Sequence, residues 1–139
     1  MKTMPAISEA EWQVMTVLWD HNPATAGEIV GVLHGRVDWK PTTVKTLLGR
    51  LVKKGAVAFS QRGREYVYRP QLEREECIRA ASSSFLGRLF GGSLVPMVAQ
   101  LVDTGALSSK DIRDLRQVLD RGADRLGRGN RGRVGKKSK

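Results

Sequence analysis

The sequence is poor in cysteine and has no long apolar run. Cys77 is the single cysteine among 139 residues, so the chain can form no internal disulfide and no cage of several thiolates. No apolar stretch approaches the roughly 18–20 residues that cross a bilayer. Residues 1–12 also lack the apolar core of a signal peptide. We therefore expect a cytoplasmic protein with no membrane insertion.

Motifs for catalysis and for metal binding are missing as well. The sequence contains no P-loop, no dinucleotide-binding fingerprint and no nucleophile elbow. His21 and His34 have no second His or Cys at ligand spacing, and Cys77 lies in an apolar-periodic stretch typical of a packed core thiol. We expect no enzymatic activity, no cofactor and no metal site.

Acidic residues are absent between Asp38 and Glu65, and basic residues are unevenly spread along the chain. The net charge of +10 divides into +4 over residues 1–72, −1 over residues 73–120 and +7 over residues 121–139. A basic balance predicts a polyanionic partner, which is either nucleic acid or an anionic membrane surface. The neutral, apolar middle of the chain predicts contact with protein instead.

Two capping boxes indicate where the first helices begin. In each box a Ser or Thr side chain caps free backbone N–H groups, and a Glu three residues later caps in return. Apolar residues at helical spacing follow both boxes. The boxes are Ser8 with Glu11, before an expected helix at residues 9–20, and Thr25 with Glu28, before one at about 26–35 whose buried face is Ile29, Val32 and Leu33.

The segment that starts at Pro41 predicts a third helix with two unlike faces. Proline fits the first helical turn, and Gly55 ends the pattern. A stripe of aliphatic residues forms one face, and the opposite face holds threonines, cations and Gly49 without any acid. The stripe consists of Val44, Leu47, Leu48, Leu51 and Val52.

The order of these elements predicts a winged helix-turn-helix. The apolar period changes to two over residues 57–70, which is typical of a β-hairpin with Gly63 in its turn. The expected fold is therefore mainly α with a small β-hairpin wing, followed by further helices. We assign residues 1–72 to a DNA-binding domain, 73–121 to a helical dimerisation domain, and 122–139, rich in Gly and cations, to a disordered basic tail.

The polar face of the third helix is the candidate site, because this helix enters the major groove in helix-turn-helix proteins. Arg50 suits the edge of a guanine, and the threonines suit base edges or phosphates. Judged from this helix alone, an ordinary surface exposed to water explains the polar face equally well. The candidate DNA contacts are Lys40, Thr42, Thr43, Lys45, Thr46, Arg50, Lys53 and Lys54, with Arg62 and Arg64 at the hairpin tip.

These segments resemble the BlaI/MecI family of penicillinase and methicillin-resistance repressors over about residues 6–120. The motifs that carry the resemblance are "ISEAEWQVMTVLW", "WKPTTVKTLLGRLVKKGAV", "GREYVYRP" and "SSKDIRDLRQVL". The resemblance implies a homodimeric repressor, with a winged helix on an inverted repeat and C-terminal helices in the dimer interface. The paired cysteines of the copper-responsive branch are absent here.

The resemblance also implies a route of release. Relatives in the penicillinase branch are inactivated by a protease that cuts an Asn-Phe bond in the fifth helix, and Gln100 and Leu101 occupy that place here. The different residue pair leaves the exact bond open. Relatives carry a serine at the cap of the third helix, where this chain has Lys40, which exchanges a cap for a cation.

We therefore expect a homodimeric transcriptional repressor that binds a palindromic operator in double-stranded DNA. Its release would follow an upstream signal such as cleavage by a regulatory protease. The first alternative is an architectural protein that binds nucleic acid without regard to sequence. Two further alternatives remain. One is an adaptor that binds an acidic protein through the third helix, and the other is a protein that binds an anionic membrane surface through its basic tail.

Overall fold

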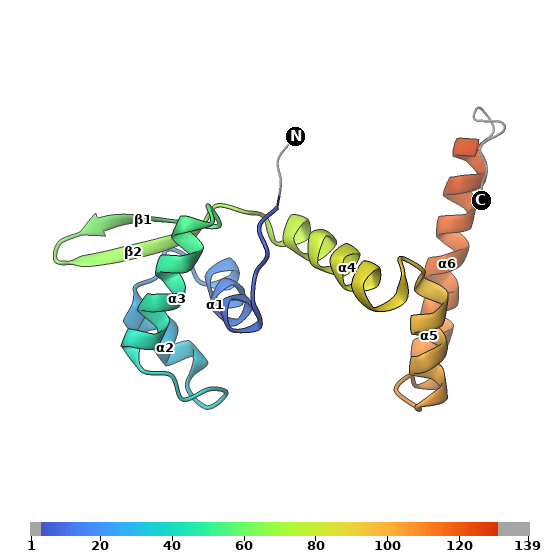
Figure 1. The fold of residues 1–139 in the computed structure, drawn as a ribbon, viewed down its shortest axis with the longest axis horizontal. Coiled ribbons are helices and arrows are strands. Elements are labelled where there is room, and N and C mark those ends of the chain that lie inside the picture. Colours follow the sequence, from blue (N-terminus) through green and yellow to red (C-terminus); the bar gives the residue numbers. More distant parts are fainter. Residues whose placement is uncertain (1–3, 131–139) are drawn as a thin grey trace. The chain divides into compact units, whose positions relative to one another are not determined.

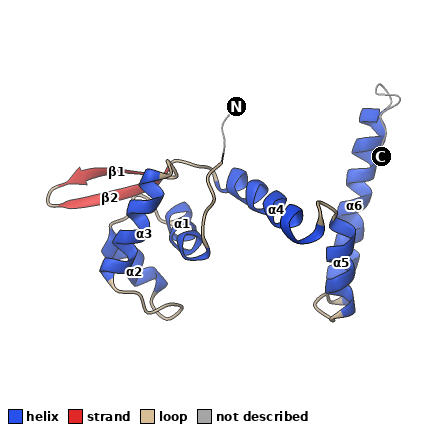
Figure 2. Cartoon of the chain, in the orientation of Figure 1, coloured by secondary structure: helices blue, strands red, loops and turns tan. Residues whose placement is uncertain are grey.

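Three helices and a two-stranded hairpin form the N-terminal part of the chain (Figures 1 and 2). The structure is a computed structural model that describes residues 4–130, and the chain divides into two units between residues 89 and 90. The predicted class, mainly α with a β-hairpin wing, is confirmed. The first unit contains α1 (Glu9–Asp20), α2 (Ala26–Leu33), α3 (Pro41–Lys53), β1 (Val57–Arg62), β2 (Glu65–Pro70) and most of α4 (Arg74–Phe90).

Both capping boxes are present, and they determine where α1 and α2 begin. The Ser8 hydroxyl accepts the Glu11 N–H at 3.1 Å, and the Glu11 carboxylate accepts the Ser8 N–H at 2.9 Å. Thr25 and Glu28 make the same exchange at 3.1 and 2.8 Å. The prediction for the end of α2 was two residues too long. The helix ends at Leu33, because the next residue already leaves the helical conformation.

The apolar faces of α1, α2 and α3 meet in one core. The predicted stripe of α3 is buried from Val44 to Leu51, and Val52 is half-buried. Each fully buried aliphatic side chain contributes about 1.5–3 kcal/mol relative to an exposed one. Val32, predicted for the buried face of α2, is instead 39% exposed. The fully or almost fully buried side chains include Val14, Met15, Leu18, Ile29, Leu33, Val44, Leu48 and Leu51.

The hairpin forms an antiparallel pair in which Val57 lies opposite Pro70 and Arg62 opposite Glu65. Gly63 turns the chain with a φ of 64°, a conformation that glycine adopts without strain. Backbone hydrogen bonds of 3.0 and 2.8 Å join β2 at Tyr68 to Ala24 in the loop before α2. The wing is therefore tied by backbone bonds to the loop that precedes α2.

An ion pair between buried Glu11 and the more exposed Lys54 connects the end of α3 with the beginning of α1. The Glu11 side chain is buried, and its Oε1 lies 2.5 Å from the Lys54 Nζ. The same ammonium donates to the Ala6 carbonyl at 2.7 Å. Burial raises the pKa of Glu11, but the hydrogen bond from Lys54 and those from Ser8 outweigh it, so the pKa lies below its ordinary value. This pair fixes α3 against α1 at the end of α3 that follows Arg50.

Helix α4 begins on the first unit. The Leu72 and Cys77 side chains are buried in its core, which confirms the packed thiol, and burial raises the pKa of Cys77. The Trp19 indole N–H donates to the Leu72 carbonyl at 3.0 Å. The sequence placed a boundary at residue 72, whereas the compact unit extends to residue 89, because these contacts hold the start of α4.

The second unit contains α5 (Leu94–Asp103) and α6 (Ser109–Asn130). A third capping box, between Ser108 and Asp111, precedes α6 with both hydrogen bonds at 3.0 Å. Neither helix has a buried residue among those described. In residues 4–130 no single helix is long and apolar enough to span a membrane, although α4 and α5 taken together pass a test of length and composition.

The disordered tail predicted from residue 122 is wrong for its first nine residues, because α6 continues to residue 130. Gly122, Gly127 and Gly129 each cost a helix about 1 kcal/mol relative to Ala. Once the capping box has nucleated the helix, elongation through Ala123, Arg125 and Leu126 is favourable enough to continue. Residues 131–139 of the predicted tail lie outside the described residues.

Removing the buried carboxylate should destabilise the first unit. We expect Glu11→Ala to lower the free energy of unfolding by about 1–3 kcal/mol, since it removes the hydrogen bonds that the buried carboxylate makes with Lys54 and Ser8. Because the pKa of Glu11 is lowered on folding, its contribution is complete above the unfolded value near 4.5 and is lost as the pH falls through the folded value. Urea unfolding from pH 7 to pH 3 measures both effects, with the exposed Glu9→Ala as control. An equal loss of unfolding free energy in Glu11→Ala and Glu9→Ala would contradict a special stabilising role for Glu11.

Candidate nucleic-acid interface

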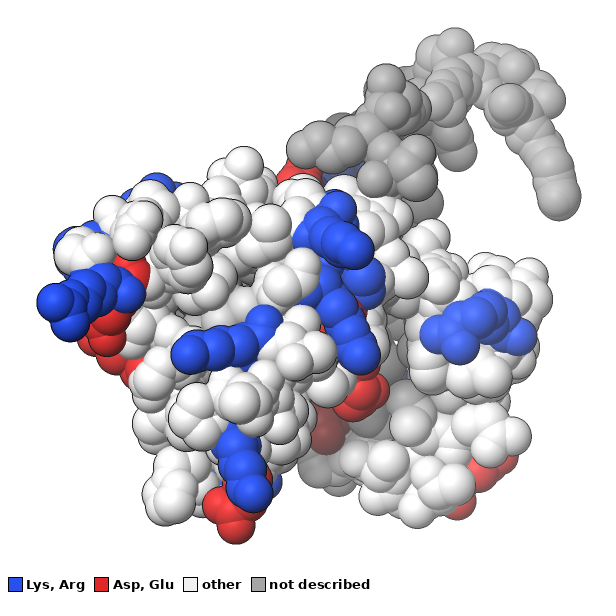
Figure 3. Space-filling view, turned by 60° about the vertical axis from the view of Figure 1, so that its left-hand side comes forward, with Lys and Arg blue, Asp and Glu red and all other residues white. Residues whose placement is uncertain are grey.

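The polar face of α3 lies on the surface because the opposite face is buried. Pro41 at the first position starts the helix, and Lys40 precedes it without a side-chain cap bond. With the aliphatic stripe packed on α1 and α2, the helical period turns the threonines and cations outward. Figure 3 shows Lys and Arg side chains spread over the face that carries α3 and the hairpin. The exposed candidate residues are Lys40, Thr42, Thr43, Lys45, Thr46, Arg50 and Lys53 on or beside α3, and Arg62 and Arg64 on the hairpin.

These exposed cations are free to meet an external anion. Within residues 4–130, none of them lies within salt-bridge distance of a carboxylate. The Thr46 hydroxyl donates to the Thr42 carbonyl at 3.0 Å, which still leaves the oxygen as an acceptor for a base N–H. Charged groups without an internal partner contribute little to stability, so the exposed arginine and lysines are available for binding.

Lys54 differs from the other predicted contacts. Two N–H groups of its ammonium are already used, on the buried Glu11 carboxylate and on the Ala6 carbonyl. Turning it toward a phosphate would leave that carboxylate buried without its partner, which is costly. In the structure Lys54 supports α3, and its predicted contact with DNA stays a prediction that the ion pair with Glu11 disfavours. The sequence could not identify its partner, which lies 43 residues away.

Gly49 lies on the exposed face of α3, between Thr46 and Arg50. A Cβ built at Gly49 meets no atom within 4 Å, so the fold of the described chain gives no reason for glycine there. Glycine in a helix interior nevertheless costs about 1 kcal/mol relative to alanine. No contact among residues 4–130 compensates this cost, which fits close approach of an external surface to the helix backbone.

Beside α3 lies a hollow of about 380 Å³ that sequence reasoning missed. It collects a lysine from α3, an arginine from the hairpin turn and two tyrosines from β2, next to the first turn of α2. Burial raises the pKa of Tyr68, with a further rise from Tyr66, so its hydroxyl stays protonated and can donate. One carboxylate, Glu65, also lines the hollow. The lining residues are Thr25, Ala26, Gly27, Pro41, Lys45, Arg64, Glu65, Tyr66 and Tyr68.

The tyrosines of this hollow belong to an aromatic group on the wing. The Phe59 and Tyr66 rings meet edge to face at 5.1 Å, and both residues are about half exposed. Phe59 also lies 6.1 Å from the Tyr68 ring. The alternating aromatic residues of "GREYVYRP" were the available signal, but they show neither that the rings meet nor that they lie beside Lys45.

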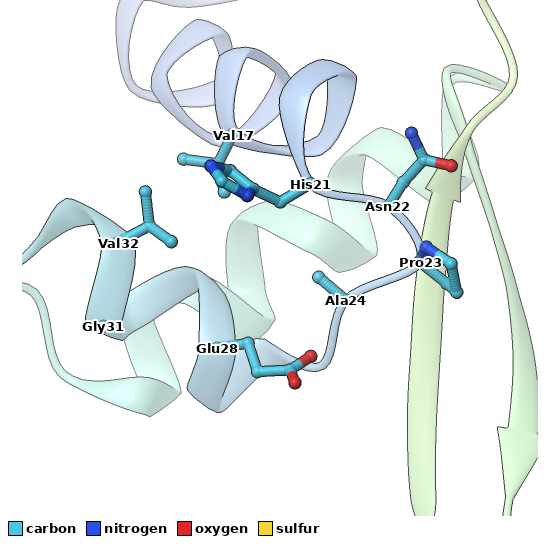
Figure 4. A pocket seen from close by; sticks show the side chains of 8 residues that line it. All are labelled: Val17, His21, Asn22, Pro23, Ala24, Glu28, Gly31 and Val32. Atoms are coloured by element: carbon cyan, nitrogen blue, oxygen red, sulfur yellow. The ribbon is translucent and has the colours of Figure 1, made fainter.

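A second hollow, of about 460 Å³, opens between the end of α1 and α2 (Figure 4). Its lining includes Val17, His21, Glu28 and Val32 and no Lys or Arg. Glu28 is engaged in the capping box, and within residues 4–130 no three His, Cys, Asp or Glu side chains gather as metal ligands do. This hollow is therefore not part of the basic face. Gln100 and Leu101 lie elsewhere, in α5 of the second unit.

The fold and its exposed basic helix define a winged-helix DNA-binding protein. The sequence model described as Penicillinase repressor matches residues 7–121. The chain belongs to this family. It is 38% identical over 120 residues to the penicillinase repressor of Bacillus licheniformis, a match that covers 86% of this chain and 94% of that protein. It is 30% identical over 115 residues to the methicillin resistance regulatory protein MecI of Staphylococcus aureus strain N315, with coverages of 83% and 94%.

Solved structures include further similar proteins. The monomeric form of B. licheniformis BlaI, in complex with the blaP half-operator, is 39% identical, with 55% of this chain and 93% of that chain covered and a TM-score of 0.47. Wild-type MarR of E. coli is 18% identical, with coverages of 83% and 76% and a TM-score of 0.50. The likeness to MarR concerns the fold alone.

Neutralising the one carboxylate of the hollow beside α3 should strengthen DNA binding. We expect Glu65→Gln to tighten binding to all duplexes by about twofold to fivefold, since one exposed charge is worth about 0.2–1 kcal/mol. Fluorescence anisotropy at physiological salt measures the effect, which should shrink at high salt. Glu75→Gln on α4 is the matched control and should change nothing. Weaker binding by Glu65→Gln would show that this hollow does not face the DNA.

Proposed function

We propose that the chain is a homodimeric transcriptional repressor that binds a palindromic operator and blocks the promoter. The observation that carries this proposal is the exposed face of α3, which is free of acids and opposite a buried aliphatic stripe. Membership of the penicillinase repressor family supports the same function. The chain contributes shape and charge to repression, and no chemical step is needed.

In this proposal α3 lies in the major groove. Arg50 hydrogen-bonds a guanine edge through two N–H groups, a contact worth about 1–3 kcal/mol of discrimination. The hydroxyls of Thr42, Thr43 and Thr46 contact base edges or phosphates. Gly49 lets the helix backbone come close to the bases. The choice among sequences would therefore lie with the middle of α3.

The surrounding cations hold the DNA backbone. Lys53 extends from the last turn of α3 toward phosphates, and Lys40 lies before the first turn. Lys45, with Arg64 and Tyr66 of the hollow beside α3, surrounds another phosphate. Such phosphate contacts position a protein on DNA without reading its sequence. Removing one of them makes the affinity for DNA depend less steeply on salt concentration. Arg62 and Arg64, at the hairpin tip, contact the adjoining DNA backbone or the minor groove.

The exposed apolar surface of the second unit supports a dimer. Helix α5 has no buried residue, although its sequence is mostly aliphatic, and the described residues of α6 are also unburied. Patches of this kind on a soluble protein mark an interaction surface. A two-fold pair presents two α3 helices about 34–36 Å apart, one helical turn of DNA, so the operator would be palindromic.

Release would act through the second unit. We propose that an upstream signal, such as a regulatory protease acting near Gln100 and Leu101, separates the dimer from DNA. Gln100 is exposed and Leu101 is 38% exposed in α5. Cleavage there would require local unwinding of α5, and a helix with no buried residue resists unwinding weakly. Loss of α5 and α6 would leave each winged helix without its partner.

The full chain should distinguish its operator from other DNA. Selection from random duplexes should yield an inverted repeat, preferred over scrambled DNA by about 10³-fold or more at physiological salt. Arg50→Ala should reduce that preference, whereas Lys53→Ala should weaken binding to all duplexes equally. Equal affinity of the unaltered chain for every duplex would instead support an architectural protein. Binding that ignores DNA competitor would support the adaptor, and sedimentation with anionic liposomes would support the membrane-surface alternative.

Alanine at Gly49 should separate stability from binding. Gly49→Ala should raise the free energy of unfolding by up to about 1 kcal/mol, since the added methyl meets no atom of the described chain. It should weaken operator binding, because the methyl holds the helix away from the bases. Thermal unfolding and anisotropy titration measure the two quantities. Gly31→Ala in α2, equally free of contacts, is the control and should change stability only. Unchanged binding by Gly49→Ala would show that glycine is only tolerated there.

A further inference from the structure

Helix α6 carries an apolar stripe that its own unit does not cover. The helix has 22 residues and α5 has 10, which correspond to lengths of about 33 Å and 15 Å. Helix α5 can therefore lie along less than half of α6. The stripe of α6 consists of Ile112, Leu115, Val118, Leu119 and Leu126.

The exposure of these side chains increases along α6. Ile112 and Leu115, near its beginning, are half-buried, whereas Leu119 is 53% and Leu126 is 67% exposed. An isolated leucine on a surface needs no explanation, but Leu126 continues a regular apolar stripe. The last turns of α6 therefore present an apolar line with no partner among residues 90–127 of the same unit.

The spacing of the stripe indicates what would cover it. Ile112, Leu115, Leu119 and Leu126 follow intervals of three, four and seven, and Gly122 occupies the remaining heptad position. A strict repeat of 3.5 residues keeps apolar residues facing a second helix that runs alongside. A Cβ at Gly122 would meet no atom within 4 Å, so the helix surface is open there to a close neighbour.

We propose that α6 pairs with α6 of a second copy along its whole length, as far as Leu126. This inference rests on the proposed dimer and extends it past Arg121, where the match to the penicillinase repressor family ends. The charges beside the seam agree with self-pairing. Asp111 precedes the stripe, Arg116 lies beside its middle and Arg125 beside its end. Asp111 of one copy therefore meets Arg116 of the other in a parallel pair, and Arg125 in an antiparallel pair.

The extension would change the properties of the dimer. Leu126 of each copy becomes buried against the α6 of the other, and the segment after residue 121 acts as part of the interface rather than as a free basic tail. Burial of apolar surface at the end of a paired helix chiefly slows dissociation of the dimer. The repressor would then stay dimeric at lower concentration than a chain that stops at residue 121.

Sedimentation of the full chain and its variants tests this pairing. A chain that stops after Asn130 retains α6, and one that stops after Arg121 loses Leu126. We expect the first to dimerise like the full chain, and the second to have a dimer dissociation constant raised by about tenfold or more. Leu126→Asp in the full chain should raise it similarly and Leu126→Ala to a lesser degree. Gln117→Asp, on the opposite face of α6, should have no effect.

The outcomes separate the two proposals. If the full chain is dimeric and the Leu126 variants match it, the extended pairing is wrong and the proposed dimer stands. If the full chain is monomeric at every concentration, the proposed dimer fails as well. Circular dichroism at 222 nm of each variant shows whether the helices are retained. A weaker dimer that keeps the helical signal of the full chain would therefore support the pairing itself rather than a folding defect.

Discussion

Burial of the aliphatic stripe of α3 is the constraint on which the rest of the N-terminal unit depends. Val44, Leu48 and Leu51 are fully buried in the core that α3 shares with α1, α2 and β1. Because a helix has 3.6 residues per turn, this burial determines where every other residue of α3 points. The threonines, Gly49 and Arg50 form the outward face as a consequence. A face suited to a DNA groove thus follows from core packing, and no separate feature is needed to present it.

The cations near α3 divide into two kinds. Lys54 holds the buried Glu11 carboxylate and keeps the end of α3 in place. Lys45, Arg50 and Lys53 have no carboxylate partner among the described residues and face outward. Residue type alone does not separate the two kinds, because Lys53 and Lys54 are neighbours in sequence. They differ by the 100° turn between successive helical positions, which directs one to solvent and the other to α1.

The two units differ in how completely they bury their apolar residues. The winged helix encloses a core within one chain, whereas α5 and α6 leave aliphatic side chains at the surface. Short helices with such faces gain stability mainly by packing against something else. The proposed second copy would supply that surface, and it would also set the spacing of the two α3 helices. Dimerisation, operator symmetry and release by cleavage in α5 would then all depend on burial of the apolar surface of α5 and α6 against the second copy.

Local signals in the sequence determined the helix starts, the hairpin turn and the acid-free face of α3. Capping boxes, glycine in the turn and helical periodicity act within a few residues, so they can be read without a fold. The tertiary structure alone decided the partner of Lys54, the exposure of Val32, and the hollow that joins Lys45 to Tyr66. These three features depend on segments far apart in the chain. The continuation of α6 to residue 130 is a local matter, but it requires helix elongation to outweigh three glycines, which composition does not reveal.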